Sequence, residues 1–232
     1  MKETLTEILQ KNSQQFHPVV SFDPEKEKLF PFDFTKNNKE LTEPILNDTD
    51  KFTEYVNQKL KAANAKFGIG GYNEYRELYS RSRVFDEPGA EPRRLHLGID
   101  IWGKPYTAIM SPLDGIIHSF AFNNRYGDYG ATIILTHNLA GHSFHTLYGH
   151  LSLNSIKNLR EGGNVKKGDV TGEFGIPMEN GQWPPHLHFQ MIVDVREWKG
   201  DYPGVCRFSE KERYLNNCPD PDLILQLKKF IE

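Results

Sequence analysis

Between residues 66 and 193 the sequence alternates short runs of β-branched and aromatic residues with glycine-rich turns. The runs with strand composition span residues 96–102, 106–110, 115–122, 131–136, 143–150 and 186–193. Turn signals such as PLDG at residues 112–115 separate these runs. Many short strands with little helix between them are typical of a mainly β fold, and we predict a compact antiparallel β-sandwich or barrel-like domain.

Residues 1–65 differ in composition from the rest of the chain. We predict that they form a partly helical, partly extended segment before a β domain of residues 66–232. One helix is expected over residues 4–15 and a second over about 50–65. A last helix is expected to begin at the DPD of residues 220–222, within a C-terminal extension of the β domain.

The second predicted helix has a recognisable start and a recognisable buried face. Thr49 or Asp50 is expected to cap its N-terminus, because short polar side chains accept hydrogen bonds from the first free N–H groups. Phe52, Val56 and Leu60 then recur at helical spacing. Such an apolar stripe usually packs into a core, and we interpret it so.

The charge balance limits the possible partners of the chain. Its 232 residues include 28 Lys and Arg against 31 Asp and Glu, which gives a formal net charge of −3. Binding to nucleic acid needs concentrated positive charge, so we expect no nucleic-acid partner. The sequence leaves the oligomeric state open.

The apolar segments are too short for a membrane span or a leader. No apolar run approaches the roughly 20 residues that a membrane helix needs. The first residues, MKETLTEILQKNSQQF, lack the apolar stretch of a secretory signal. We therefore expect a cytoplasmic protein if Met1 is the natural start, and an exported one if a signal was removed.

Two cysteines, Cys206 and Cys218, are too few for a disulfide framework. They also lack the close pairing of a thiolate zinc site. We interpret them as ordinary thiols rather than a disulfide.

The first informative histidine lies in the segment HLGID of residues 96–100. Gly98 beside Ile99 and Ile101 disfavours a helix, so the segment is predicted to be a strand. Residues four apart on a strand share a face, which places His96 beside Asp100 with Gly98 between them. An imidazole and a carboxylate that converge on open space are half of a metal site, although such a pair is also common as a hydrogen-bonded structural pair.

The second segment is HLHFQ, at residues 186–190. His186 and His188 are two apart and share a face, whereas Leu187 and Phe189 point to the core. Together with the pair in HLGID, they can supply three ligands and one spare imidazole. Three protein ligands are typical of a catalytic zinc, which keeps its fourth position for water. Alternate exposed polar residues on a half-buried sheet are the plainer interpretation.

The third segment is HTLYGHL, at residues 145–151. His150 shares a face with Tyr148, whereas His145 lies on the opposite face. A position near a strand end suits His150 to act as an imidazole that does not bind the metal.

Together these segments resemble the lysostaphin/LytM-type zinc metalloendopeptidases, which carry a His-x-x-x-Asp motif, a later Tyr-x-His-Leu and a terminal His-x-His. The matching segments are HLGID at residues 96–100, YGHL at 148–151 and HLH at 186–188. Further segments that resemble the family are SPLDGII at 111–117, GATIILTH at 130–137 and VKKGDVTG at 165–172. The resemblance spans about residues 95–193.

The resemblance implies a role for each matching residue. His96, Asp100 and His188 would bind one zinc ion, and His150 and His186 would be the catalytic imidazoles. The implied fold is a compact antiparallel β structure of the duplicated hybrid motif type, with the site in a groove. The sequence does not divide the base and acid roles between His150 and His186.

Three segments depart from this family. Residues 175–184 (GIPMENGQWP) are longer and more aromatic than the short link expected there. Residues 1–65 and 198–221 have no counterpart in the minimal domain. These features resemble intracellular variants that are fused to kinase-like and aminotransferase domains, which leaves the peptidoglycan substrate in doubt.

We therefore predict a zinc metalloendopeptidase that hydrolyses a peptide bond through a metal-activated water, with peptidoglycan cross-link peptides as the possible substrate. One alternative is a zinc hydrolase of a cytoplasmic peptide or small amide. Another is a catalytically silent binding or regulatory module of the same fold. A purely structural zinc is disfavoured, because such sites usually fill all four positions with Cys and His.

A polar and aromatic stretch precedes the first motif. It could line the substrate groove, although a surface helix or loop of this composition is common. Its residues are Tyr72, Asn73, Arg76 and Tyr79.

Overall fold

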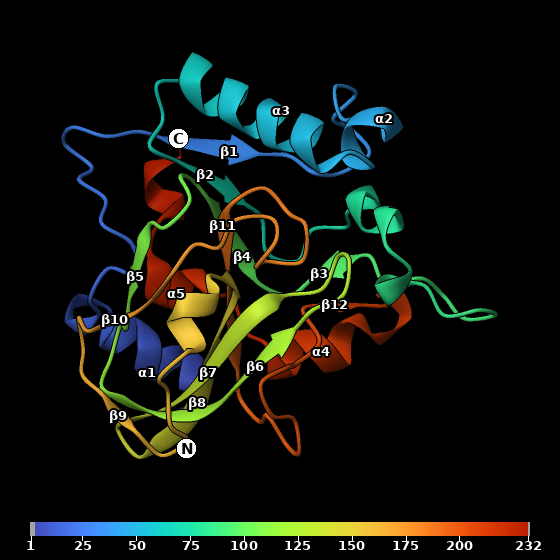
Figure 1. Cartoon of the computed structure of the whole chain (residues 1–232). Coiled ribbons are helices and arrows are strands. Elements are labelled where there is room, and N and C mark those ends of the chain that lie inside the picture. Colours follow the sequence, from blue (N-terminus) through green and yellow to red (C-terminus); the bar gives the residue numbers. More distant parts are fainter. Residues whose placement is uncertain (1–2, 232) are drawn as a thin grey trace.

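The predicted strands form one large sheet in the computed structural model, which describes residues 3–231 (Figure 1). Its eight strands lie in the order β1-β2-β4-β11-β8-β7-β6-β9. They are β1 (Leu29–Phe32), β2 (Phe67–Gly70), β4 (Ile99–Trp102), β6 (Gly115–Asn123), β7 (Gly130–Leu139), β8 (His142–Leu151), β9 (Asn164–Val165) and β11 (His186–Ile192). Only the β1–β2 pair is parallel within this sheet, so the predicted mainly β class is confirmed, with a mixed rather than purely antiparallel sheet.

Two small sheets complete the β structure. β5 (Ala108–Met110) pairs with β10 (Val170–Glu173), and β3 (Leu95–His96) pairs with β12 (Val205–Cys206). The strand predicted over residues 96–102 is therefore two strands in different sheets. The chain leaves β3 after His96 and enters β4 at Ile99, with Gly98 in the gap. A side chain there would clash with a histidine, since an added Cβ would lie 2.5 Å from Cε1 of His188.

The segment of residues 1–65 contributes to the large sheet. β1 extends its edge, and α3 (Thr49–Ala62) lies over β1 and β2 (Figure 1). The apolar stripe predicted for this helix is buried, with Phe52 fully covered. The cap is Asp48, whose carboxylate accepts from the N–H groups of Asp50 and Lys51, so the prediction of Thr49 or Asp50 is wrong by one or two positions.

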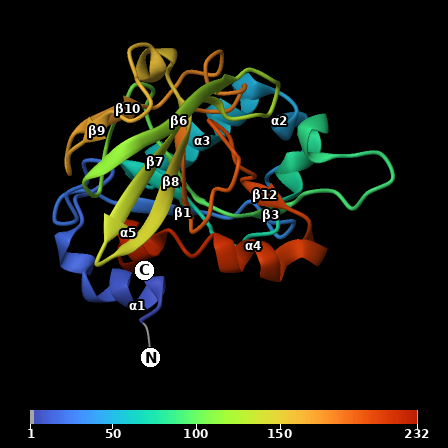
Figure 2. The same cartoon turned by 90° about the horizontal axis from the view of Figure 1, so that it is seen from below.

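The other helices are short. They are α1 (Leu5–Lys11), α2 (Glu43–Leu46), α4 (Lys211–Asn217) and α5 (Asp222–Leu225). α1 ends four residues before the predicted limit of 15, and α5 stops where Gln226 takes a left-handed conformation at φ 51°. α1 and α5 lie side by side (Figures 1 and 2). The sequence did not predict α4.

The central strand β11 is buried along its whole length. Leu187, Phe189 and Met191 pack into the main apolar core, while the alternate residues face the other way. That second face carries His186, His188 and Gln190, each at most 3% exposed. Buried polar side chains need partners, so this face of β11 is the candidate location of a polar functional site.

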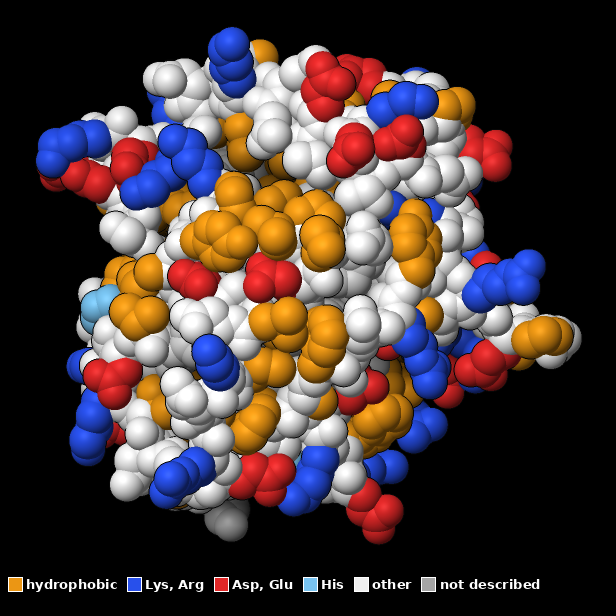
Figure 3. Space-filling view, in the orientation of Figure 1, with side chains coloured by type: hydrophobic (Ala, Val, Ile, Leu, Met, Phe, Trp, Pro, Cys, Tyr) orange, Lys and Arg blue, Asp and Glu red, His pale blue; other side chains and the backbone are white. Residues whose placement is uncertain are grey.

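The surface fits the balanced composition. Figure 3 shows acidic and basic side chains interspersed on the face turned to the viewer. Across residues 3–231, none of the helices is long and apolar enough to span a membrane. Cys206 and Cys218 are both buried free thiols, in agreement with the interpretation from sequence.

Candidate metal centre

Strand pairing brings the three predicted ligands together. His188 on β11 lies directly opposite Asp100 on β4, and their Nδ1 and Oδ1 atoms are 3.1 Å apart. His96, on β3, places its Nε2 atom 3.0 Å from Nδ1 of His188 and 3.2 Å from Oδ1 of Asp100. All three residues are at most 3% exposed. One nitrogen or oxygen of each residue thus converges on a single point.

The outer nitrogens of the two imidazoles fix their tautomers. Nδ1 of His96 lies 2.8 Å from the carbonyl oxygen of Gly71, which can only accept, so this nitrogen carries the hydrogen. Nε2 of His188 lies 2.9 Å from Oε1 of Gln190, whose amide nitrogen donates to the carbonyl of Pro203. His96 Nε2 and His188 Nδ1 therefore both point a lone pair inward in the neutral rings.

Three electron-pair donors that converge without a hydrogen between them fit a metal cation. Ligand atoms around a tetrahedral zinc with bonds of 2.0–2.1 Å would be about 3.3 Å apart, close to the observed 3.0–3.2 Å. Two imidazoles and one carboxylate are a zinc donor set that leaves a fourth position open. Hydrogen bonds from the outer nitrogens are the usual support for such ligands.

The charge states agree with this fit. Burial, followed by the nearby Arg76 guanidinium, lowers the pKa of His96 to about 4, so this ring is neutral near pH 7. Burial alone would raise the pKa of Asp100. His96 and Arg76 outweigh that effect and hold the pKa of Asp100 well below its usual range, so the carboxylate is ionised.

The other two predicted histidines lie in the same pocket. The rings of His150 and His186 have centroids 4.2 Å apart, and His150 lies 6.2 Å from His188. The indole of Trp102 stacks on His186 at 3.9 Å. His150 is the penultimate residue of β8 and has φ 63°, a strained conformation for a residue other than glycine. Strain of this kind is often found at functional positions.

Carbonyl groups fix both of these rings as well. Nδ1 of His150 donates to the carbonyl of Asn180 at 2.8 Å, and Nδ1 of His186 donates to that of Pro184 at 2.7 Å. Burial lowers the pKa of His186 to about 4 and that of His150 well below its ordinary value. Each neutral ring keeps a free lone pair on Nε2, which suits it to accept a proton.

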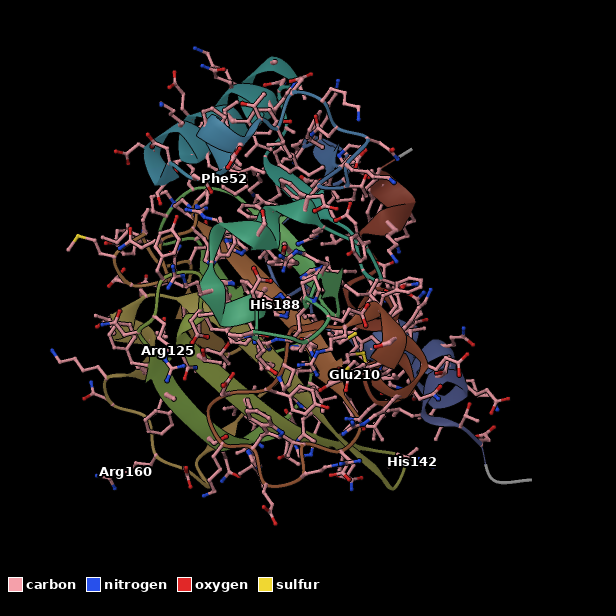
Figure 4. The ribbon with its side chains drawn as sticks, turned by 90° about the vertical axis from the view of Figure 1, so that its right-hand side faces the viewer. Phe52, Arg125, His142, Arg160, His188 and Glu210 are labelled. Atoms are coloured by element: carbon pink, nitrogen blue, oxygen red, sulfur yellow. The ribbon has the colours of Figure 1, made fainter. Side chains whose placement is uncertain are left out.

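These side chains open into a pocket of about 220 Å³. Asp100, His150, His186 and His188 line it together with aromatic and charged residues. His188 lies near the centre of the view in Figure 4, with Arg125, another lining residue, to its lower left. The aromatic lining residues are Tyr79, Phe85, Trp102, Tyr129, Trp183, Trp198 and Tyr202.

The segments that depart from the minimal family domain build much of this pocket. Residues 175–184 supply Trp183 to its wall and the carbonyl that holds His150. Residues 198–221 supply Trp198 and Tyr202. Their aromatic composition therefore shapes the site.

The polar stretch before the first motif is divided between two environments. Arg76 and Tyr79 are buried and line the pocket. Tyr72 instead donates to the carbonyl of Cys218 at 2.6 Å, and Asn73 donates its N–H to the carbonyl of His96. The interpretation as a surface helix or loop is thus wrong for Arg76 and Tyr79.

The fold and the site define a class: a mainly β protein with a His–Asp–His arrangement suited to a metal and two further neutral imidazoles beside it. Residues 94–199, somewhat under half of the chain, match the model of Peptidase family M23, so this segment is similar to that family. The match confirms the resemblance predicted from the three motifs. The likeness to variants fused to kinase-like and aminotransferase domains remains a prediction.

Individual relatives show the same similarity, and the chain spans less than half the length of the sequence relative that it matches. An L-Ala–D-Glu endopeptidase from Bacillus subtilis (strain 168) is 31% identical over 133 residues, which cover 54% of this chain and 39% of the relative. The catalytic domain of lysostaphin from Staphylococcus simulans is 22% identical, with 70% of this chain and 96% of that domain covered and a TM-score of 0.41. A zinc-containing peptidase from Vibrio cholerae is 25% identical, with coverage of 50% and 34% and a TM-score of 0.37.

Proposed function

We propose that this chain is a zinc-dependent metallopeptidase that hydrolyses a peptide bond. His96, Asp100 and His188 would hold one zinc ion, and His150 and His186 would be the catalytic residues. The observation that carries the proposal is the convergence of three lone pairs within 3.0–3.2 Å, in a pocket that also holds two neutral imidazoles. The match of residues 94–199 to a peptidase family supports the same reaction class.

A zinc ion held by these three residues would polarise the scissile carbonyl and would lower the pKa of a bound water to about 7. The protein's own contribution is proton handling at two Nε2 atoms. Because carbonyls hold the Nδ1 hydrogens of His150 and His186, each ring first accepts a proton at Nε2 and only then donates it. Proton transfer by positioned side chains typically accelerates a reaction about 10²–10⁴-fold.

The pocket lining favours a peptide as the substrate. Arg93, Arg125, Asp128 and Asp201 bring both signs of charge to it, and aromatic rings form its walls. One relative is named as an L-Ala–D-Glu endopeptidase, although the match covers only 39% of its length. On this similarity we propose peptidoglycan peptides as the first substrate class to test.

The direct test measures new amino termini released from peptidoglycan sacculi by the zinc-loaded protein. His188→Ala serves as the blank, because it removes one of the three proposed ligands. Release by the wild type alone would support the proposal. If the wild type binds one zinc ion but releases nothing, peptidoglycan is not its substrate. Cytoplasmic peptides and small amides are then tested in the same assay, and inactivity on all of them would contradict the proposal and indicate a silent module.

A further inference from the structure

Arg76 is a completely buried arginine in direct contact with a proposed metal ligand. It is 1% exposed, and its Nη1 atom donates to Oδ2 of Asp100. The same nitrogen lies 3.2 Å from the hydroxyl of Tyr79, and Nε donates to Oε2 of Glu74. An arginine is almost never fully buried unless it is paired, so these contacts explain its position.

The contacts of Arg76 converge with those of His96. Nη2 of Arg76 donates at 3.2 Å to the carbonyl of Gly71, the group that also accepts from Nδ1 of His96 at 2.8 Å. An added Cβ at Gly70 would lie 2.8 Å from Nη2, so the glycine leaves room for the guanidinium. One short stretch of chain therefore supports two of the three proposed ligands.

This stretch lies outside the part of the chain that matches the peptidase family. The match begins at residue 94, whereas Gly71, Glu74 and Arg76 precede it. Arg76 also lies over the ring of Phe34, 5.2 Å from its centroid, and Glu74 accepts from the N–H of Phe34 at 3.2 Å. The N-terminal part of the chain thus reaches the metal centre through Arg76.

The two oxygens of Asp100 have different partners. Oδ2 accepts from Arg76, whereas Oδ1 faces His96 and His188 at 3.2 and 3.1 Å. A carboxylate held in this way turns Oδ1, rather than Oδ2, toward the point where the three ligand atoms converge. We propose that Arg76 is a positioning residue of the metal centre, which holds Asp100 so that it binds through Oδ1 alone and keeps the remaining coordination position free.

The inference rests on the proposed zinc site, and its test uses binding and spectroscopy rather than turnover. Zinc affinity is measured on the full chain by competition with a chromogenic chelator. The visible absorption of the cobalt-loaded protein reports the number and arrangement of the ligands. The variants are Arg76→Ala, Arg76→Lys and the control Arg81→Ala.

Arg81 is a close match for the control. Arg81 is the last residue of the short 3₁₀ helix Glu77–Arg81, which begins directly after Arg76. It is buried as well, at 9% exposed. Its guanidinium bonds to Tyr126 and Thr49 and does not touch the three ligands. Loss of either arginine should lower the melting temperature, so thermal stability alone does not distinguish positioning from packing.

Arg76→Ala is expected to lower zinc affinity about 10–100-fold, the usual cost of removing a partner of a ligand, and to change the cobalt spectrum. Arg76→Lys keeps the charge but not the planar fork, so it should lose less affinity and still shift the spectrum. Arg81→Ala should match the wild type in both readouts.

A folded Arg76→Ala protein with wild-type zinc affinity and an unchanged cobalt spectrum would overturn the inference. If that variant does not fold, an unchanged spectrum in Arg76→Lys would overturn it equally. A wild-type chain that binds no zinc would instead contradict the proposed function itself, so the two failures are distinguishable.

Discussion

The site histidines (His96, His150, His186 and His188) differ from a second group on the neighbouring strands. In the second group, Nδ1 of His118 and of His145 lies against the hydroxyls of Ser119 and Thr136, and Nε2 of His137 lies against that of Thr146. We call His118, His137 and His145 the outer histidines. A hydroxyl can donate or accept, so these contacts do not fix which nitrogen of His118 or of His145 carries the hydrogen.

The contrast shows that burial alone does not make a metal site. His137 is 1% exposed, as buried as the proposed ligands, yet its two nitrogens face a carbonyl and a hydroxyl. Each site histidine also donates from one nitrogen to an oxygen that only accepts, but the second nitrogen of His96 and of His188 points at the other proposed ligands rather than at a hydroxyl. The partner of the second nitrogen therefore separates His137 from the proposed ligands.

The largest effect is expected from His188→Ala. It removes one of three converging lone pairs, so stoichiometric zinc binding and peptide hydrolysis should both fall to background. The control His145→Ala alters an outer histidine and should retain one zinc ion per chain. Metal analysis after dialysis measures the zinc content of both variants. Equal zinc contents would contradict the distinction between site and outer histidines.

A second effect separates the two roles within the site. His150→Ala and His186→Ala should retain zinc and reduce turnover about 10²–10⁴-fold, because they remove proton acceptors rather than ligands. Turnover and zinc content are measured on the same preparations. Loss of the metal in His150→Ala would move that residue into the ligand set.

A third effect uses two glycines that each lie against a histidine ring. An added Cβ at Gly98 would lie 2.5 Å from Cε1 of His188, and one at Gly115 would lie 2.8 Å from Nδ1 of His137. Gly98→Ala and Gly115→Ala should each cost about 1–3 kcal/mol in the free energy of unfolding through overpacking. Only Gly98→Ala should also weaken zinc binding. A parallel loss of zinc affinity in Gly115→Ala would contradict the separation of the two groups.

The smallest effect concerns pH. Burial, followed by the nearby His118 and His137, lowers the pKa of His145 from 6.5 to about 4. Between these values the unfolded chain binds a proton that the folded chain does not. The free energy of unfolding should therefore fall as the pH falls from 6.5 to 4. We expect about 1 kcal/mol from this residue, reduced for its partial exposure.

The measurement for His145 is urea unfolding of the chelated wild type and of His145→Gln at pH 7 and pH 4.5. The variant should lose less stability across this range than the wild type, because glutamine does not titrate. Equal losses in the two proteins would show that the ring titrates normally in the fold.

Much of the sheet was predictable because its residues alternate with a period of two. Five of the six predicted strand runs match β5, β6, β7, β8 and β11 to within a few residues. The sixth run, residues 96–102, is interrupted at Gly98, where the imidazole of His188 takes the place of a side chain. That contact joins residues far apart in sequence, so no local pattern reveals it.

The edge strands and α4 had weaker signals. β1 has the sequence LFPF and β2 has FGIG, and each contains a residue that disfavours strands. Their parallel pairing depends on packing between distant segments. Sequence alone gives no measure of that packing.

The spacing of the motifs indicated all five proposed site residues, but not the hydrogen-bonding groups that fix the orientation of their side chains. Gln190 alternates with His186 and His188 on β11, so the period of two was a usable signal for it. The contacts from Gly71 and Asn180 come from backbone carbonyls, which carry no signature of residue type. Arg76 meets Asp100 only because the chain turns back between residues 71 and 96, a path that the sequence does not specify.

The central claim is that His96, Asp100 and His188 form the metal site and the outer histidines do not. An anomalous difference map at the zinc edge, from crystals of the zinc-loaded protein, tests it most directly. One strong peak per chain is expected, about 2.0–2.2 Å from His96 Nε2, His188 Nδ1 and Asp100 Oδ1. No peak at that point, or a stronger one at the outer histidines, would contradict it.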